Sequence, residues 1–358
     1  MEDSRGWVRQ NVKRLARRFL NHSGQLEEER ERLFLKHGSE LLAELVTCCK
    51  DKCRCNPIKS FTAEQVLRAT NYFQHSFFDD GDSNWYKGTL DDRPVLVKKY
   101  SDQGPSSVAY RDIAISSQMS SHKNSLKLLG CCLEFPGPAI VYEDAENTHL
   151  RSKNVDGLSL SWNMRLKIAK EIANAITYLH TAFARPIIHR NIRASSIFVD
   201  KDNVAKLCNF GDSISIPEGE THVSVLVQGV LGYLDPVYFR TSNVTEQTDV
   251  YSFGVLLLIL LTGRRVIDYD RHENICQFVV NLVENERFKE IVDHKILEEG
   301  GGTNEEQELQ LQAFLKLALC CINQEIEERP QMIDVAKELV KIQKVHRLTH
   351  GAELAHPN

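Results

Sequence analysis

No hydrophobic run in this sequence of 358 residues is long enough to cross a membrane. The longest apolar stretch, from Phe253 to Leu261, is about half of what a bilayer span needs. Met1 is followed by Glu2, where N-myristoylation needs a glycine, and the charged first residues contain no apolar signal-peptide core. We therefore expect neither a membrane-spanning segment nor a secretory signal.

A strong charge of one sign is also missing, since 44 Lys and Arg against 49 Asp and Glu give a formal charge of −5. This balance argues against a globally basic nucleic-acid binder and against an acidic disordered chain. Some cysteines are direct neighbours, at Cys48-Cys49, Cys131-Cys132 and Cys320-Cys321, which is a poor layout for a disulfide framework. We expect a reduced, cytoplasmic chain with no nucleic-acid partner.

The first twenty residues hold more Lys and Arg than acids, with apolar residues between them. A basic amphipathic helix in peripheral contact with anionic lipid and a solvated arm both fit this pattern. From Glu27 to Val46 we expect two short helices interrupted by Gly38. Four apolar residues fall on one face of the second helix, and either the main domain or a partner must cover them: Leu41, Leu42, Leu45 and Val46.

Four cysteines follow within eight residues, interleaved with basic residues: Cys48, Cys49, Cys53 and Cys55. A zinc site lacks a second cluster of matching spacing. The basic neighbours suit acylation, and surface thiols without a role are the third alternative. Asn56-Pro57 then marks a boundary.

Alternation from Asp92 to Tyr100 and the apolar run from Ala139 to Tyr142 predict strands, with a helix from Val108 to Met119 between them. Beyond Leu160 the apolar spacing predicts mainly helices, at 162–180, 250–261, 274–285, 307–322 and 332–345. The chain thus divides into an N-terminal extension, a strand-rich lobe, a larger helical lobe and a tail, at 1–56, 57–145, 146–347 and 348–358.

A series of short motifs runs through both lobes: VLVK at 95–98, HRNIRASS at 189–196, NFG at 209–211, GYLDP at 232–236 and DVYSFG at 249–254. Their order and spacing resemble the signature set of eukaryotic protein kinases. The strings KLLGCCLE at 127–134 and VYSFGVLLLILLTGRR at 250–265 resemble plant receptor-like and receptor-like cytoplasmic kinases. The resemblance implies an α+β bilobal fold, with an antiparallel sheet and one helix in the N-lobe and a mainly helical C-lobe.

The resemblance assigns four residues to a nucleotide site: Lys98, Asp112, Glu143 and Ala145. Lys98 matches the phosphate-binding Lys of VAIK. Asp112 stands where the helix Glu would pair with that Lys and is one methylene shorter, so we expect a longer or water-bridged contact.

The glycine loop that should cover the phosphates is absent. In register with GxGxxGxVYKG, the three glycine positions hold Phe78, Asp80 and Ser83. Side chains there obstruct the approach of phosphate to backbone, and the nearby acids Asp79, Asp80 and Asp82 repel it. We expect no required cofactor and at most weak ATP binding.

The catalytic positions are degenerate. The position of the base in HRDxKxxN holds Asn191, which is neutral, and this loss alone typically costs about 10² to 10⁴ in rate. The Lys position holds Arg193, and the metal-ligand positions hold Ser196 and Asn209, which bring no charge to a cation that prefers carboxylates. We expect no functional catalytic residue and no metal site.

A rival hypothesis, a weakly active Ser/Thr kinase, needs Asp200, Asp202 or Asp212 to replace the missing acids. The positions that stabilise the kinase fold match the family better than the catalytic positions do. They hold Asp249, His189, Phe210 and Gly211. One departure concerns the fold: Val237 stands for the Glu of the APE-type motif, so we expect Arg329 to lose its usual ion-pair partner.

Three features resemble a plant group of kinase-dead receptor-like cytoplasmic kinases: RLFLKHGSELLAELV at 32–46 ahead of SFTAEQVLRATNYF at 60–73, the absent glycine loop, and CCLEFPGP at 131–138. Members of that group act as adaptors of a coiled-coil NLR immune receptor. The resemblance implies a scaffold that links such a receptor to cytoplasmic kinases modified by pathogen effectors, in the cytoplasm or at the inner face of the plasma membrane. We expect Leu41, Leu42, Leu45 and Val46 to contact the receptor.

Overall fold

The computed structural model describes residues 3–48, 58–145, 147–150, 160–268, 272–298 and 305–352. The chain forms two compact units. The first holds 1–47, 57–114 and 128–143, and the second holds 48–56, 115–127 and 144–358. Cys49, Cys53 and Cys55 lie outside the described residues, so the alternatives for the cysteine cluster stay predictions. No helix in the described ranges is long and apolar enough to span a membrane.

The first unit is built on a six-stranded sheet of order β1-β5-β6-β4-β3-β2. Its strands are β1 (Lys59–Ser60), β2 (Ser76–Asp79), β3 (Ser83–Leu90), β4 (Arg93–Tyr100), β5 (Leu128–Cys132) and β6 (Ala139–Glu143). All neighbouring strands are antiparallel except β1 and β5, so the sheet is mixed rather than purely antiparallel. Positive φ angles at Asp91 and Asp92 suit the two-residue turn that joins β3 to β4.

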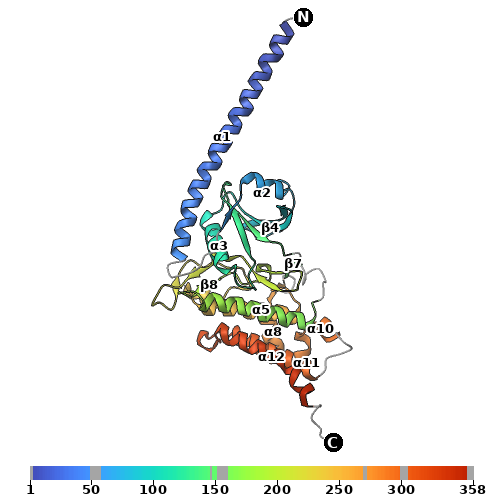
Figure 1. Cartoon of the computed structure of the whole chain (residues 1–358). Coiled ribbons are helices and arrows are strands. Elements are labelled where there is room, and N and C mark those ends of the chain that lie inside the picture. Colours follow the sequence, from blue (N-terminus) through green and yellow to red (C-terminus); the bar gives the residue numbers. More distant parts are fainter. Residues whose placement is uncertain are drawn as a thin grey trace. The chain divides into compact units, whose positions relative to one another are not determined.

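Three helices accompany this sheet: α1 (Asp3–Cys48), α2 (Ala63–Ala69) and α3 (Ser106–Met119). α1 is a single continuous helix (Figure 1), so the prediction of two short helices is wrong. A glycine inside a helix costs only about 1 kcal/mol, so Gly38 does not break it. The backbone is helical from Asp3, while lipid contact of the first twenty residues stays a prediction.

One face of α1 packs on the rest of the first unit. Leu33 and Leu41 are buried there, together with His37, which is 1% exposed. His37 Nδ1 lies 3.0 Å from the Leu133 carbonyl oxygen, and its ring lies 5.8 Å from that of Tyr110. Burial lowers the pKa of His37, so the ring is neutral at neutral pH and Nδ1–H donates to Leu133.

The second unit is mainly helical (Figure 1). Its helices are α5 (Trp162–Thr181), α6 (Pro236–Thr241), α7 (Glu246–Thr262), α8 (Ile275–Glu284), α9 (Phe288–Ile291), α10 (His294–Glu298), α11 (Glu305–Cys321) and α12 (Met332–Ala352). α7 is buried from Thr248 to Thr262 and is capped at its C-terminus by Gly263, whose φ of 65° lies in the left-handed region that favours glycine. The two units confirm the predicted α+β class.

Short strands and 3₁₀ turns carry the catalytic-loop motifs of the second unit. β8 (Ile187–Ile188) precedes the loop and pairs with β11 (Ile214–Ser215). β9 (Ile197–Val199) follows it and pairs with β10 (Ala205–Leu207). The turns η1 (Ala194–Ser196) and η2 (Phe210–Asp212) contain the ends of the HRNIRASS and NFG motifs.

Candidate functional site

The backbone of the loop around residue 190 is held by one buried carboxylate. Asp249, on α7 and 0% exposed, accepts hydrogen bonds from the backbone N–H of His189 at 2.7 Å and of Arg190 at 2.9 Å. It also lies 2.9 Å from His180 Nε2, which donates to it. These bonds hold Arg190 at a φ of 64°, a left-handed conformation that an unsupported non-glycine residue rarely adopts.

The packing between this loop and the NFG motif is also complete. The rings of His189 and Phe210, both 0% exposed, have centroids 5.2 Å apart at an angle of 64°. His189 Nε2 lies 3.0 Å from the carbonyl oxygen of Cys208, just before Asn209. The second unit thus has the framework of a catalytic loop.

The catalytic and metal-ligand positions of this framework hold other residue types than the kinase motifs do. Ser196, at the metal-ligand position, donates its hydroxyl to the Asn191 carbonyl of its own loop at 2.7 Å. Asn209 is 3% exposed and has a φ of 68°, which asparagine tolerates. Arg193 is half-buried in the same loop. Across the described ranges, no three His, Cys, Asp or Glu side chains converge as a metal ion would need.

Asp212 is the acid that the fold brings to Asn191. Asn191 Nδ2 donates to Asp212 Oδ2 at 2.8 Å, so a carboxylate lies beside the position of the missing base. Asp200 instead closes its own turn by accepting the backbone N–H groups of Asp202 and Val204. Of the three acids named in the rival hypothesis, only Asp212 is placed where it could take part.

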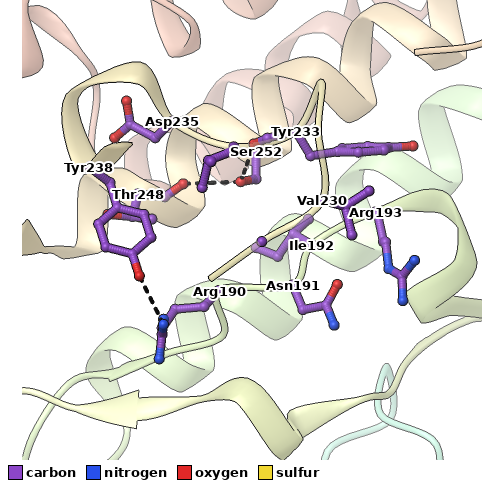
Figure 2. A pocket seen from close by; sticks show the side chains of 12 residues that line it. Arg190, Asn191, Ile192, Arg193, Val230, Tyr233, Asp235, Tyr238, Thr248 and Ser252 are labelled. Atoms are coloured by element: carbon purple, nitrogen blue, oxygen red, sulfur yellow. Dashed lines mark hydrogen bonds between the residues drawn. The ribbon is translucent and has the colours of Figure 1, made fainter. Parts of the chain in front are cut away.

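The catalytic loop shares a pocket with residues 229–238 (Figure 2). Arg190 Nη2 donates to the Tyr238 hydroxyl at 2.8 Å, and Nη1 donates to the Asp212 carbonyl at 3.2 Å. In the close-up, the side chains of Asn191 and Arg193 extend from the loop on the same side of the pocket. Arg190 therefore ties the loop to the following segment through neutral acceptors.

Arg329 lacks its usual partner, because Val237 stands at the Glu position, but it pairs with another acid. It makes two bonds to Asp235, Nη1 to Oδ2 at 2.8 Å and Nη2 to Oδ1 at 2.9 Å, and both side chains are 0% exposed. Asp235 lies two residues before Val237 and also caps α6. The sequence prediction considered only the motif position, whereas an acid two residues away reaches the same guanidinium.

In the first unit, Lys98 and Asp112 lie in direct contact. Lys98 Nζ is 2.8 Å from Asp112 Oδ2, so the expected longer or water-bridged contact is wrong. The Tyr100 hydroxyl accepts from Lys98 at 2.9 Å and donates to Asp112 at 2.7 Å. Burial, together with the charge of Asp112, raises the pKa of Tyr100 well above its usual value. Glu143 is exposed at the end of β6, and Ala145 is buried in the second unit.

The turn between β2 and β3, where the glycine loop would lie, uses its backbone N–H groups internally. Gly81 N donates to the Asp79 carboxylate at 2.8 Å, and Ser83 N donates to the Asp80 carboxylate at 2.9 Å. Asp80 N donates to the Ser83 carbonyl at 3.1 Å. Because these donors are taken, they cannot cradle a phosphate. Neither this turn nor Asn209 and Ser196 fit a magnesium nucleotide.

The predicted receptor-binding residues fall on two sides of α1. Leu41 is 6% exposed and packs in the first unit, and Leu45 is half-buried, so the expectation of one uncovered face is not met. Leu42 and Val46 are 62% and 60% exposed, and Leu35, which the sequence reasoning missed, is 64% exposed. Their spacing of seven and four residues places Leu35, Leu42 and Val46 in one row, the α1 stripe.

Framework and site together define a protein kinase fold with degenerate catalytic positions. Residues 81–339 match the family described as protein tyrosine and serine/threonine kinase, and the chain belongs to this family. It is 44% identical over 330 residues to the Non-functional pseudokinase ZED1 of Arabidopsis thaliana, which covers 89% of this chain and 98% of that protein. This places it with receptor-like cytoplasmic kinases of the pseudokinase group.

Of two further relatives from Arabidopsis thaliana, one is named a pseudokinase and the other a kinase. The Non-functional pseudokinase ZRK2 is 40% identical over 350 residues, 91% of this chain and 96% of that protein. The Serine/threonine-protein kinase ZRK1 is 42% identical over 335 residues, 88% of this chain and 94% of that protein. Similarity alone therefore does not decide activity, and the residues at the site carry that argument.

Proposed function

We propose that the protein is a catalytically disabled kinase that acts as an adaptor in plant immune signalling. In this role it links a coiled-coil NLR receptor to cytoplasmic kinases modified by pathogen effectors. The observation that carries the proposal is the catalytic-loop framework of a kinase, anchored by Asp249. It presents Asn191, Ser196 and Asn209 where the chemistry needs acids and a metal ligand. Its place is the cytoplasm, or the inner face of the plasma membrane if the basic N-terminal residues touch lipid.

The α1 stripe supports a protein partner. Leu33, His37 and Leu41 anchor one face of α1, while Leu35, Leu42 and Val46 present a row of exposed apolar side chains on the other. Burying a leucine or valine from water contributes about 1.5–3 kcal/mol, so this row can supply the apolar centre of an interface. We assign the receptor to this stripe, which narrows the predicted set to Leu42 and Val46 and adds Leu35.

The substitution Leu42→Glu or Val46→Glu is expected to abolish co-purification of the receptor from plant tissue. A charge in the centre of an apolar interface loses its hydration without gaining a partner. Because both side chains are exposed in the free protein, the thermal unfolding midpoint should stay unchanged. The matched control is Leu309→Glu, since Leu309 is 57% exposed but lies on α11 of the second unit. Receptor binding that survives Leu42→Glu and Val46→Glu would remove the α1 stripe from the interface.

Weak phosphoryl transfer is the second candidate function, favoured by the Asp212 carboxylate beside Asn191. We expect wild-type protein, given radiolabelled ATP and a generic acceptor, to transfer no more label than its Lys98→Ala variant. The missing base and metal carboxylate each reduce the rate, the first by typically 10² to 10⁴. Transfer that is lost in both Lys98→Ala and Asp212→Asn would instead establish a kinase that uses Asp212. Asp202→Asn, in an exposed turn, is the control for the charge change.

A further inference from the structure

The ammonium group of Lys98 is enclosed by side chains of the first unit. Two carboxylates face it, Asp112 at 2.8 Å and Asp80 at 3.9 Å, and the side chains of Lys98 and Asp80 are 4% and 5% exposed. The ring centroids of Tyr100 and Trp85 lie 4.6 Å and 5.6 Å from Nζ. Lys98 is thus fully engaged within its own unit.

Asp80 is held in this position by the turn that replaces the glycine loop. Its Oδ1 accepts from the backbone N–H of Ser83 at 2.9 Å and from the Ser83 hydroxyl at 2.8 Å. Its Oδ2 accepts from Trp85 Nε1 at 3.3 Å and is the oxygen that faces Lys98. A buried carboxylate with three donors and a nearby ammonium is a satisfied group, so its inward position is stable.

Trp85 fills the space beside Asp80. It stands where the GxGxxGxV pattern has valine, and it is 0% exposed. Its indole stacks on Tyr142, with ring centroids 5.6 Å apart and an angle of 21° between the planes. The Tyr142 hydroxyl in turn donates to Asp112 Oδ1 at 3.3 Å. The indole thus contacts both Asp80 and Tyr142, and Tyr142 contacts Asp112.

We propose that Asp80 and Trp85 occupy the Lys98 site in place of a nucleoside triphosphate and thereby exclude that class of ligand. The inference concerns the first unit alone and does not depend on which proteins the chain binds. A phosphate can reach Lys98 only if Asp80 leaves, which breaks its bonds to Ser83 and Trp85. If Asp80 stays, the phosphate meets two carboxylates around a single ammonium and is repelled.

The test is thermal unfolding of the full chain with and without millimolar ATP in the absence of magnesium, because Asn209 and Ser196 do not fit the metal ion. Wild type is expected to show no shift. The Asp80→Ala/Trp85→Val variant removes the Asp80 carboxylate from Lys98 and from the Ser83 N–H, and it places valine at position 85. It is expected to gain on the order of 5 °C at saturating nucleotide, because a ligand stabilises only the state that binds it. Asp82→Ala is the matched control, since it removes an exposed acid of the same turn and should show no ATP-dependent shift.

Two results would overturn the proposal. One is a wild-type shift with ATP that disappears in Lys98→Ala, and the other is a folded double variant that shows no shift with ATP. A second readout does not depend on the double variant folding. With an amine-reactive reagent, wild-type Lys98 should be labelled at least tenfold more slowly than the exposed Lys87 of β3, and Asp80→Asn should narrow that ratio. Equal labelling of the two lysines in wild type would also refute an occupied Lys98 site.

Discussion

Replacing Asp235 by alanine is expected to lower the free energy of unfolding by about 3–5 kcal/mol, the usual effect of removing one partner from a buried ion pair. Asp235 and Arg329 are both 0% exposed and form two hydrogen bonds with each other. The variant leaves the guanidinium without its counter-charge. It also removes the cap of α6, where Asp235 Oδ1 accepts from Val237 N at 2.9 Å, which adds about 1 kcal/mol.

A urea titration measures this loss, and a second substitution tests its cause. Val237→Glu places an acid at the position that the APE-type motif uses, so in the Asp235→Ala background it should recover part of the stability. Asp334→Ala is the control, because Asp334 is 57% exposed and its pair with Lys337 contributes at most about 1 kcal/mol. If Asp235→Ala costs no more than this control, then the carbonyl groups of Asn323 and Gln247 suffice to hold Arg329.

Periodicity and motif spacing predicted most of the fold correctly. The apolar patterns placed β4, α3, α5, α7, α8 and α11 close to their observed bounds, because each buries one face or all of its surface. The start of α12 was also correct, but the helix extends to Ala352 instead of ending at residue 345. α1 differs from the prediction because it continues through Gly38. A single glycine destabilises a helix by only about 1 kcal/mol, which is too little to interrupt it. The spacing along α1 does not reveal which face packs on the rest of the unit. It therefore does not distinguish Leu41, which is buried, from Leu42, which is exposed.

Side chains that changed their role could not be found from motif positions. Asp235 compensates for Val237 from two residues away, and Asp80 turns inward to Lys98 rather than simply repelling phosphate. Both ion pairs join residues that are distant in sequence and lie within 4 Å of each other in the fold. Motif positions alone do not predict such contacts. Asp112 shows the same limit, since the backbone of α3 carries its shorter side chain into direct contact with Lys98.

The second large effect is expected at Asp249, where the Asp249→Ala substitution should lower the free energy of unfolding by at least about 3 kcal/mol. The variant leaves the buried N–H groups of His189 and Arg190 and the Nε2–H of His180 without an acceptor. Each buried donor left unsatisfied costs about 1–3 kcal/mol. Asp249→Asn should lose less, because its amide oxygen can still accept, although its NH₂ group faces another donor.

Urea titrations of Asp249→Ala, Asp249→Asn and the exposed control Asp202→Ala should rank the loss in that order. Equal midpoints for Asp249→Ala and Asp202→Ala would show that the loop is held by other contacts, such as the His189–Phe210 pair. The expected ranking would show that the loop still needs Asp249 to hold its backbone, although the catalytic acid itself is replaced by Asn191.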